Sequence, residues 1–337
     1  MNFDIPIVFF IFKRKEKSLK ILKRISQIKP RKLYIISDYG RTDEENILVE
    51  ECRKTVLDNI NWECEVVKDF ATKNMGCYDR IGLGALRVFE KEKVAIFLED
   101  DNLPEVSFFY YCQELLDKYY NDEDVLWICG TNYLKKYHNA DGSDYVFSSH
   151  MFPCGWASWS HKFNKYYDKD FSGFTTENLQ RIKDSYSNKR AYRKDYKNWQ
   201  LEISEKKQKG RYKSWDYQMS FSLRLHNKIG IVPCYNQITN IGVDSFSEHG
   251  GTSLKNPMTK RFCELESYEL EFPLKHPNLK KVDEIFEKKI DEIEIPPRYF
   301  SAYLEIIDVM YKLVSLSPVL LEFLKKIKTK WNKFNRK

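Results

Sequence analysis

The sequence predicts an α/β protein in which a mainly parallel sheet has helices on both faces. Short apolar runs recur along the first hundred residues, and longer amphipathic stretches separate them. This alternation predicts parallel strands joined by crossover helices, since such strands are apolar when both faces of the sheet are covered. The 337 residues, 42% of them hydrophobic, suffice for one large domain with an appended segment or for two modest domains.

The first third of the chain carries the alternation most clearly. Strands are expected at residues 5–12, 32–37, 62–67 and 94–98. Helices are expected between them, at residues 13–28, 42–60 and 79–90. Further along, a helical pattern at 202–210 belongs to an inserted segment, and a helix at 219–225 is followed by a strand at 229–233.

Charge and cysteine usage narrow the class of protein. The 56 basic and 49 acidic residues give a net charge of +7, which is compatible with phosphate-bearing ligands or an anionic membrane surface. No nucleic-acid recognition motif accompanies this excess, so no nucleic-acid partner is expected. The eight cysteines are scattered without a CxxC pair, which favours a reducing, cytoplasmic location. No signal peptide or membrane-spanning stretch is recognisable, so any membrane contact is expected to be peripheral.

Three consecutive carboxylates, Glu99, Asp100 and Asp101, follow directly on the expected strand at 94–98. In open α/β sheets, ligand crevices form at the carboxyl ends of the strands. Adjacent carboxylates repel one another and are tolerated most easily when a cation or several donors hold them. A solvated turn is the alternative, but the apolar strand before the triplet favours a cation site.

This order of motifs resembles the GT-A glycosyltransferases, in particular the N-acetylglucosaminyltransferase I type, whose metal motif is also Glu-Asp-Asp. The similarity covers residue 5 to about residue 252. It implies a Rossmann-like GT-A fold that binds a nucleotide-sugar, with a preference for uridine. It also implies that Asp101 binds a divalent ion, Mn²⁺ or Mg²⁺, that Asp100 contacts the ribose and that Glu99 supports the donor site. Such an ion stabilises the diphosphate that leaves when the sugar is transferred.

The same resemblance implies further contacts to the donor. These come from the end of the first strand, the turn after the second, the loop before the helix at 79–90, and the segment 152–159: Phe12, Arg14, Asp38, Asn74, Gly76, Gly155 and Trp156. Asp38 corresponds to an aspartate that faces the uracil, and the Gly-Trp pair to a loop that lines the donor sugar. The residues alone leave alternatives open. Asp38 could cap the following helix, and the tryptophans of 152–159 could pack in the core.

Catalytic and closing elements are expected downstream. Asp216 precedes the expected helix at 219–225, where the resemblance places the general base of inverting members. A helix cap is the alternative for this residue. The segment 240–244 and His249 resemble a closing loop whose histidine is a further metal ligand. The spacing from Gly242 to His249 departs from the commoner arrangement.

We expect two regions: a catalytic domain at 1–255 and a linker with an amphipathic helical segment at 256–337. Within the first, residues 162–213 form an inserted acceptor-side subdomain, whose basic character suits an acidic glycan or a lipid diphosphate. A helix is expected to begin at Ser317. Its apolar stripe lies between lysines, which is typical of a helix that binds an anionic membrane surface, here the inner face: Leu320, Leu324, Ile327, Trp331 and Phe334. Packing on protein is the alternative.

The predicted function is an inverting, metal-dependent hexosyl- or N-acetylhexosaminyltransferase. It would move a sugar from a nucleotide-sugar to a hydroxyl of a glycan or lipid-linked glycan, as in bacterial surface polysaccharide synthesis. One alternative is a nucleotidyltransferase, but residues 12–16 lack the glycine-rich loop expected of one. Another is an inactive, membrane-associated glycan-binding module, which should have lost Asp101 or Asp216.

Overall fold

The computed structural model describes residues 3–244, 254 and 257–295. Residues 1–291 form one compact unit, and residues 292–337 form a second. The helix expected from Ser317 and the expected ligand His249 therefore lie outside the described residues. No helix in the described part of the chain is long and apolar enough to cross a membrane.

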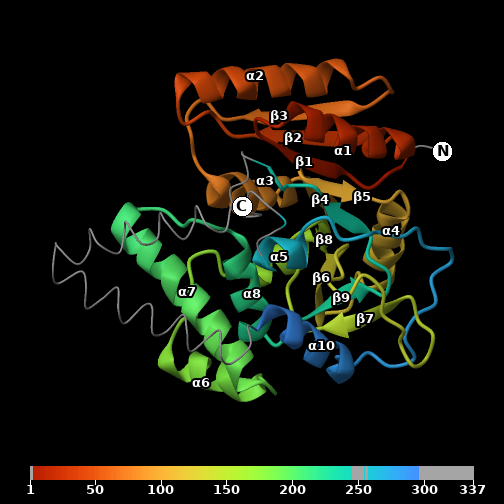
Figure 1. Cartoon of the computed structure of the whole chain (residues 1–337), viewed down its shortest axis with the longest axis vertical. Coiled ribbons are helices and arrows are strands. Elements are labelled where there is room, and N and C mark those ends of the chain that lie inside the picture. The colour runs from red at the N-terminus through yellow and green to blue at the C-terminus, as the bar shows by residue number, and fades with distance from the viewer. Residues whose placement is uncertain (1–2, 245–253, 255–256, 296–337) are drawn as a thin grey trace, which may run out of the picture. The chain divides into compact units, whose positions relative to one another are not determined.

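An eight-stranded sheet forms the centre of the first unit, in the order β3-β2-β1-β4-β8-β6-β9-β7 (Figure 1). Its strands are β1 (Ile7–Ile11), β2 (Lys32–Ser37), β3 (Glu65–Phe70), β4 (Val94–Glu99), β6 (Val125–Cys129), β7 (Tyr145–Ser148), β8 (Trp156–Trp159) and β9 (Ile229–Pro233). Six of them run in one direction, while β8 and β7 run antiparallel to their neighbours. The predicted mainly parallel α/β sheet is confirmed.

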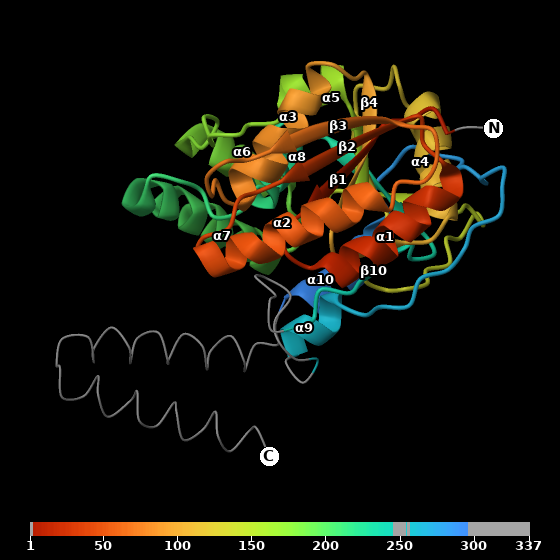
Figure 2. The same cartoon turned by 90° about the horizontal axis from the view of Figure 1, so that it is seen from above.

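Helices cover both faces of this sheet (Figures 1 and 2). The α-helices of the described residues are α1 (Lys15–Ile28), α2 (Asp43–Asp58), α3 (Leu83–Phe89), α4 (Ser107–Lys118), α5 (Ser160–Tyr166), α6 (Thr176–Ser185), α7 (Lys189–Lys209), α8 (Asp216–Leu225), α9 (Pro257–Phe262) and α10 (Glu284–Glu294). Of these, α6 and α7 lie beside the sheet (Figure 1). Alternation along β1 explains the two faces: Phe9 joins the core cluster beneath α1, and Phe10 points to the other side, towards Gly84 of α3.

Two boundaries differ from the sequence-based expectation in informative ways. The third strand begins at Glu65 rather than near Trp62, whose indole Nε1 donates to the carbonyl of Pro30 at 3.1 Å. This hydrogen bond ties Trp62 to Pro30 and keeps the residues just before Glu65 out of the β2–β3 strand pairing. The helix expected at 42–60 is α2, and Thr42 is its N-cap, since its hydroxyl accepts from the N–H of Glu45 at 3.2 Å.

A short second sheet, which the sequence pattern does not predict, lies beside the carboxylate triplet. It pairs β5 (Asn102–Pro104) with β10 (Ile238–Asn240) in antiparallel register. Asn102 lies opposite Asn240, and the N–H of Ile241 donates to the carbonyl of Asp101 at 2.8 Å. This pairing brings the segment after β10 against the end of β4.

The segment 263–283, part of the region 256–337 expected as a linker and a helical segment, belongs to the first unit. Leu274 is buried, and the N–H of Tyr268 donates to the carbonyl of Asn236 at 2.8 Å. Glu269 accepts from the first amides of α4, including that of Ser107 at 2.8 Å. The compact unit that holds the sheet therefore extends past residue 255, to residue 291.

Candidate active site

The carboxyl ends of β1 and β4 place the first group of candidate residues together. β1 and β4 are parallel neighbours, so the residues that follow them emerge at the same edge of the sheet. The Asp100 side chain is buried there, and it accepts from the N–H of Phe12 at 3.3 Å. It also accepts from the guanidinium of Arg14 at 2.5 Å. The predicted proximity of Phe12, Arg14 and Asp100 is present.

Arg14 also contacts Asp101, with its Nη2 atom 3.1 Å from Oδ2. Only 16% of the Arg14 side chain is exposed. Burial alone lowers the pKa of Arg14, but the charges of Asp100 and Asp101 outweigh this effect and raise it above its ordinary value. The guanidinium thus stays charged and neutralises part of the acidic site.

Asp101 is bordered on two sides, by Asn102, which sequence reasoning missed, and by Gly242 of the expected closing segment 240–244. Its Oδ1 accepts from the side-chain amide Nδ2 of Asn102 at 2.6 Å, and the side-chain Oδ1 of Asn102 accepts from the N–H of Gly155 at 2.9 Å. On the other side, a Cβ at Gly242 would lie 2.5 Å from Asp101 Oδ2, so the loop after β10 passes close to the carboxylate. The contact of Asn102 with Asp101 could have been predicted, because Asn102 directly follows the triplet in the sequence. The closeness of Gly242 to Asp101 depends on the β5–β10 pairing.

Glu99 and Asp216 come from distant segments but interact electrostatically. Burial is the main cause that raises the pKa of Glu99 well above its usual range, and the charges of Asp101, Asp100 and Asp216 add to it. Asp216 is the first residue of α8, and Ser214 Oγ donates a hydrogen bond to its Oδ1. The N-cap position is Trp215, and no side chain caps the helix. Asp216 therefore lies at the site without acting as the helix cap.

Asp38 anchors the loop that contains Asn74 and Gly76. Its Oδ1 accepts from the N–H of Met75 at 2.9 Å, and its Oδ2 accepts from the N–H of Gly76 at 2.7 Å and the amide of Asn74 at 3.1 Å. Gly76 adopts a φ of +87°, which favours glycine. The three predicted residues are together, and both Asp38 oxygens are occupied by this loop.

The structure corrects the expectation for Trp156, which is 1% exposed and lies in the core. Its ring stacks against Phe97 and Trp127, with ring centroids 3.8 Å and 4.3 Å away. Because β8 lies between β4 and β6 in the sheet, the Trp156 ring packs among side chains of those two strands instead of facing a donor sugar. Gly155, at φ +63°, is required by packing, because a Cβ would lie 2.5 Å from Ile238.

Carboxylate oxygens, which this site contains, are ligands that suit a hard divalent cation. Asp100 and Asp101 contact the guanidinium of Arg14, and Glu99 and Asp216 interact electrostatically beside them. In the described residues, however, no three His, Cys, Asp or Glu side chains are grouped as a ready metal site. Any ion held by Asp101 would therefore need oxygen ligands from its substrate, water or residues outside the described ranges.

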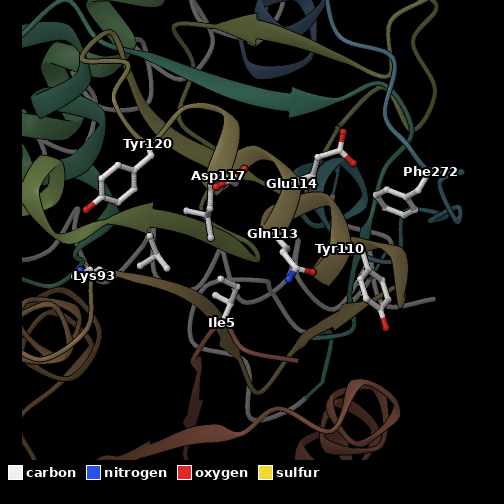
Figure 3. Close-up of a pocket in the computed structure, with 10 residues that line it drawn as sticks. Ile5, Lys93, Tyr110, Gln113, Glu114, Asp117, Tyr120 and Phe272 are labelled. Carbon is white, nitrogen blue, oxygen red and sulfur yellow. The ribbon is translucent and has the colours of Figure 1, made fainter. Parts of the chain in front are cut away.

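A groove of about 740 Å³ lies away from these residues (Figure 3). Ile5 and Val94 line it, and these residues stand at the amino ends of β1 and β4. Tyr110 and Asp117 of α4 and Phe272 of the 263–283 segment complete much of the wall. The groove is thus at the edge opposite the carboxylates.

No protein-family model and no curated protein matches the chain. Among solved structures, it is similar to a mannosyltransferase from Pyrobaculum calidifontis in complex with GDP-Man and Mn²⁺, at 13% identity and a TM-score of 0.33, covering 47% of this chain and 45% of that one. It is also similar to mouse xyloside xylosyltransferase 1, at 10% identity and a TM-score of 0.33, covering 67% and 84%. A UDP-glucose pyrophosphorylase complexed with UDP-glucose matches at 9% identity and a TM-score of 0.33, covering 70% and 93%. Likenesses this distant carry no argument about function.

Proposed function

We propose that this chain is a metal-dependent glycosyltransferase, which binds a nucleotide-sugar at the carboxyl edge of the sheet and passes the sugar to a hydroxyl of a glycan or lipid-linked glycan. One observation carries the proposal: at the carboxyl ends of the parallel strands β1 and β4, Asp100 and Asp101 both contact the guanidinium of Arg14. Asp216, held by Ser214 at the start of α8, interacts electrostatically with Glu99 of the same triplet. Glycosyl transfer by direct displacement needs carboxylates in two places. One set serves the leaving diphosphate, and the other accepts a proton from the attacking hydroxyl.

On the leaving-group side, Asp101 would hold the divalent ion, Mn²⁺ or Mg²⁺, which supplies positive charge to the diphosphate. Arg14 provides a second positive charge at the same place. Asp100 is fixed by the Phe12 amide and by Arg14. We assign it the contact with the ribose. We assign the nucleotide, a uridine nucleotide in the proposal, to the space beside Phe12 and the 74–76 loop that Asp38 anchors.

On the acceptor side, Asp216 is proposed as the general base of an inverting transfer. The hydrogen bond from Ser214 engages Oδ1 and orients the carboxylate. Oδ2 would then accept the proton of the acceptor hydroxyl as that oxygen bonds to the anomeric carbon. A base and a leaving group on opposite faces of the sugar must come from different segments, and residues 99–101 and 216 meet this condition.

The donor can be tested by a hydrolysis screen of nucleotide-sugars with and without Mn²⁺. We expect one nucleoside diphosphate to be released in a metal-dependent way. Formation of pyrophosphate from a nucleoside triphosphate and a sugar phosphate would instead identify a nucleotidyltransferase. Indifference to every donor would favour a glycan-binding module.

We also propose that the C-terminal segment holds the enzyme at the cytoplasmic face of the membrane, because its sequence carries the apolar stripe between lysines. A chain truncated before Ser317 should no longer sediment with anionic liposomes while donor hydrolysis persists. Loss of folding or of donor hydrolysis on truncation would show that the segment serves the fold.

A further inference from the structure

The loop between α7 and α8 presents two exposed cations beside the candidate site. Along this stretch, Tyr212 and Ser214 are buried while Arg211 and Lys213 are exposed. Alternate residues thus point in opposite directions, as in an extended chain. Lys206, on the last turns of α7, adds a third exposed cation, with its Nζ 5.2 Å from the ring of Tyr212. We call Lys206, Arg211 and Lys213 the cationic rim.

Buried contacts fix the backbone of the loop. Glu202 of α7 is 3% exposed, and its carboxylate accepts from the N–H groups of Lys213 at 2.9 Å and Ser214 at 3.1 Å. The Tyr212 ring packs against Tyr78, with centroids 4.8 Å apart, and its hydroxyl donates to the carbonyl of Asp170 at 3.0 Å. The cations therefore project from an ordered segment.

The cationic rim borders the site. A Cβ on Gly76 would lie 3.6 Å from Arg211 Nη1, so the guanidinium lies against the loop that Asp38 anchors. The next residue, Cys77, interacts electrostatically with Glu99 and Asp216, whose charges add to burial in raising the pKa of its thiol. At the other end of the loop, Ser214 donates to Asp216. Arg211 thus lies beside the 74–76 loop, and Lys213 is the exposed neighbour of the residue that donates to the proposed base.

The cations of the rim interact with other groups of the described chain only through the ring of Tyr212 and at longer range. No carboxylate there forms an ion pair with Lys206, Arg211 or Lys213, whereas Arg14 pairs with Asp100 and Lys17 pairs with Asp244. Burial raises the pKa of Asp79, and the more distant charges of Lys206 and Arg211 oppose that rise without forming a contact. An anionic ligand would supply the ion-pair partner for these cations.

We infer that the cationic rim binds a phosphate group carried by the acceptor. This inference rests on the proposed function and names its acceptor class. The carboxylates of the site repel an anion, so an anionic acceptor needs compensating cations at the entrance. Arginine presents a planar fork that matches phosphate, and the donor's own diphosphate is assigned to Arg14 and Asp101 instead.

The test is a calorimetric titration of the full chain with octyl phosphate, with octyl glucoside as the uncharged probe. We expect octyl phosphate to bind the unaltered protein more tightly. In Arg211→Ala/Lys213→Ala its affinity should fall about tenfold or more, as for the loss of charge-assisted hydrogen bonds. A matched control, Lys197→Ala/Lys207→Ala, removes two exposed charges from the preceding helix α7 and should leave the affinity within about twofold.

Two results would overturn the inference. One is equal octyl phosphate affinity in the two double variants. The other is an equally large loss of UDP affinity in Arg211→Ala/Lys213→Ala in the presence of Mn²⁺, because the rim would then serve the donor. Thermal unfolding of each variant checks that the fold is intact. Failure of the proposed function would appear separately, as absence of metal-dependent donor hydrolysis in the unaltered protein.

Discussion

Arg14 lies between two carboxylates of the triplet, and its closest approach to Asp101 is 3.1 Å, from Nη2 to Oδ2. The same nitrogen is 2.5 Å from Asp100 Oδ1, so one guanidinium holds both acids in place. A cation bound by Asp101 would share that carboxylate with Arg14. The site therefore holds a permanent positive charge beside the carboxylate to which we assign the divalent ion, and both charges would neutralise a leaving diphosphate.

Replacing Arg14 with Gln should destabilise the protein, because buried Asp100 would lose its charged partner. We expect the free energy of unfolding to fall by roughly 3 kcal/mol, measured by urea denaturation. Arg31→Gln is the control: Arg31 pairs with Asp4, and the two side chains are 67% and 64% exposed. Its loss should have an effect below about 0.5 kcal/mol. Similar effects for the two variants would show that the Arg14 pair adds no special stability.

Asp101→Asn should remove the dependence of nucleotide binding on the metal. The amide keeps the size of the side chain and an oxygen that accepts from Asn102, but it lacks the charge that Mn²⁺ requires. Calorimetric titration of UDP with and without Mn²⁺ measures this directly. Asp117→Asn makes the same chemical change at an exposed position on α4 and should leave the metal dependence intact. Unaltered Mn²⁺-dependent binding in Asp101→Asn would refute the assignment.

Asp216→Asn should lower turnover by about 10²–10⁴-fold with little change in donor affinity, because a general base acts on the chemical step. Ser214→Ala, which removes the hydrogen bond to Oδ1, should lower turnover less. Because Asp216 does not cap α8, the free energy of unfolding of Asp216→Asn should differ from that of the unaltered protein by less than about 1 kcal/mol. Proton NMR of the product gives an independent check: a retained anomeric configuration would rule out single displacement and this role for Asp216.

Trp156→Phe tests whether this ring belongs to the core or to the donor site. In the core, the smaller ring loses contacts with Phe97 and Trp127, so the free energy of unfolding should fall by roughly 1–3 kcal/mol. The KM for the nucleotide-sugar should stay within about threefold, since the buried indole offers no face to a ligand. A large rise in KM with unchanged stability would return Trp156 to the donor site.

Lys162 should make stability depend on pH. Its side chain is 1% exposed, and its Nζ donates to the carbonyls of Tyr119 and Val125. Burial lowers the pKa of Lys162 to about 8 from 10.5. Between these values the unfolded chain binds the proton more fully than the folded protein, so this residue makes stability rise with pH, by at most about 1.4 kcal/mol per unit.

The measurement is the urea midpoint of the unaltered protein and of Lys162→Met from about pH 7.5 to 9.5. Lys162→Met should remove the upward contribution, while Lys169→Met, at an exposed position, should keep the slope of the unaltered protein. Parallel curves for the unaltered protein and Lys162→Met would mean that Lys162 is not the titrating group.

Local pattern was enough to predict the α/β architecture and the position of the acidic triplet. Strand and helix periodicities are properties of neighbouring residues, so β1, α1, β2 and α2 could be read from the apolar runs and amphipathic stretches. The triplet could be placed at a ligand-binding edge because parallel strands end on the same side of a sheet. The resemblance to GT-A glycosyltransferases supplied the candidate donor-binding residues. Among these, Asp38 and the 74–76 loop lie together.

Tertiary structure alone decided how these residues are used. The pairing of β5 with β10 joins segments more than a hundred residues apart and brings Gly242 against Asp101. The neighbours of β8 in the sheet decide that Trp156 is a core residue, although its sequence context equally fits a surface loop. Burial beside Asp100 and Asp101 makes Arg14 a bridge instead of a solvated cation. Contacts between distant segments depend on sheet order and long-range packing, which the periodicity of a single segment does not encode.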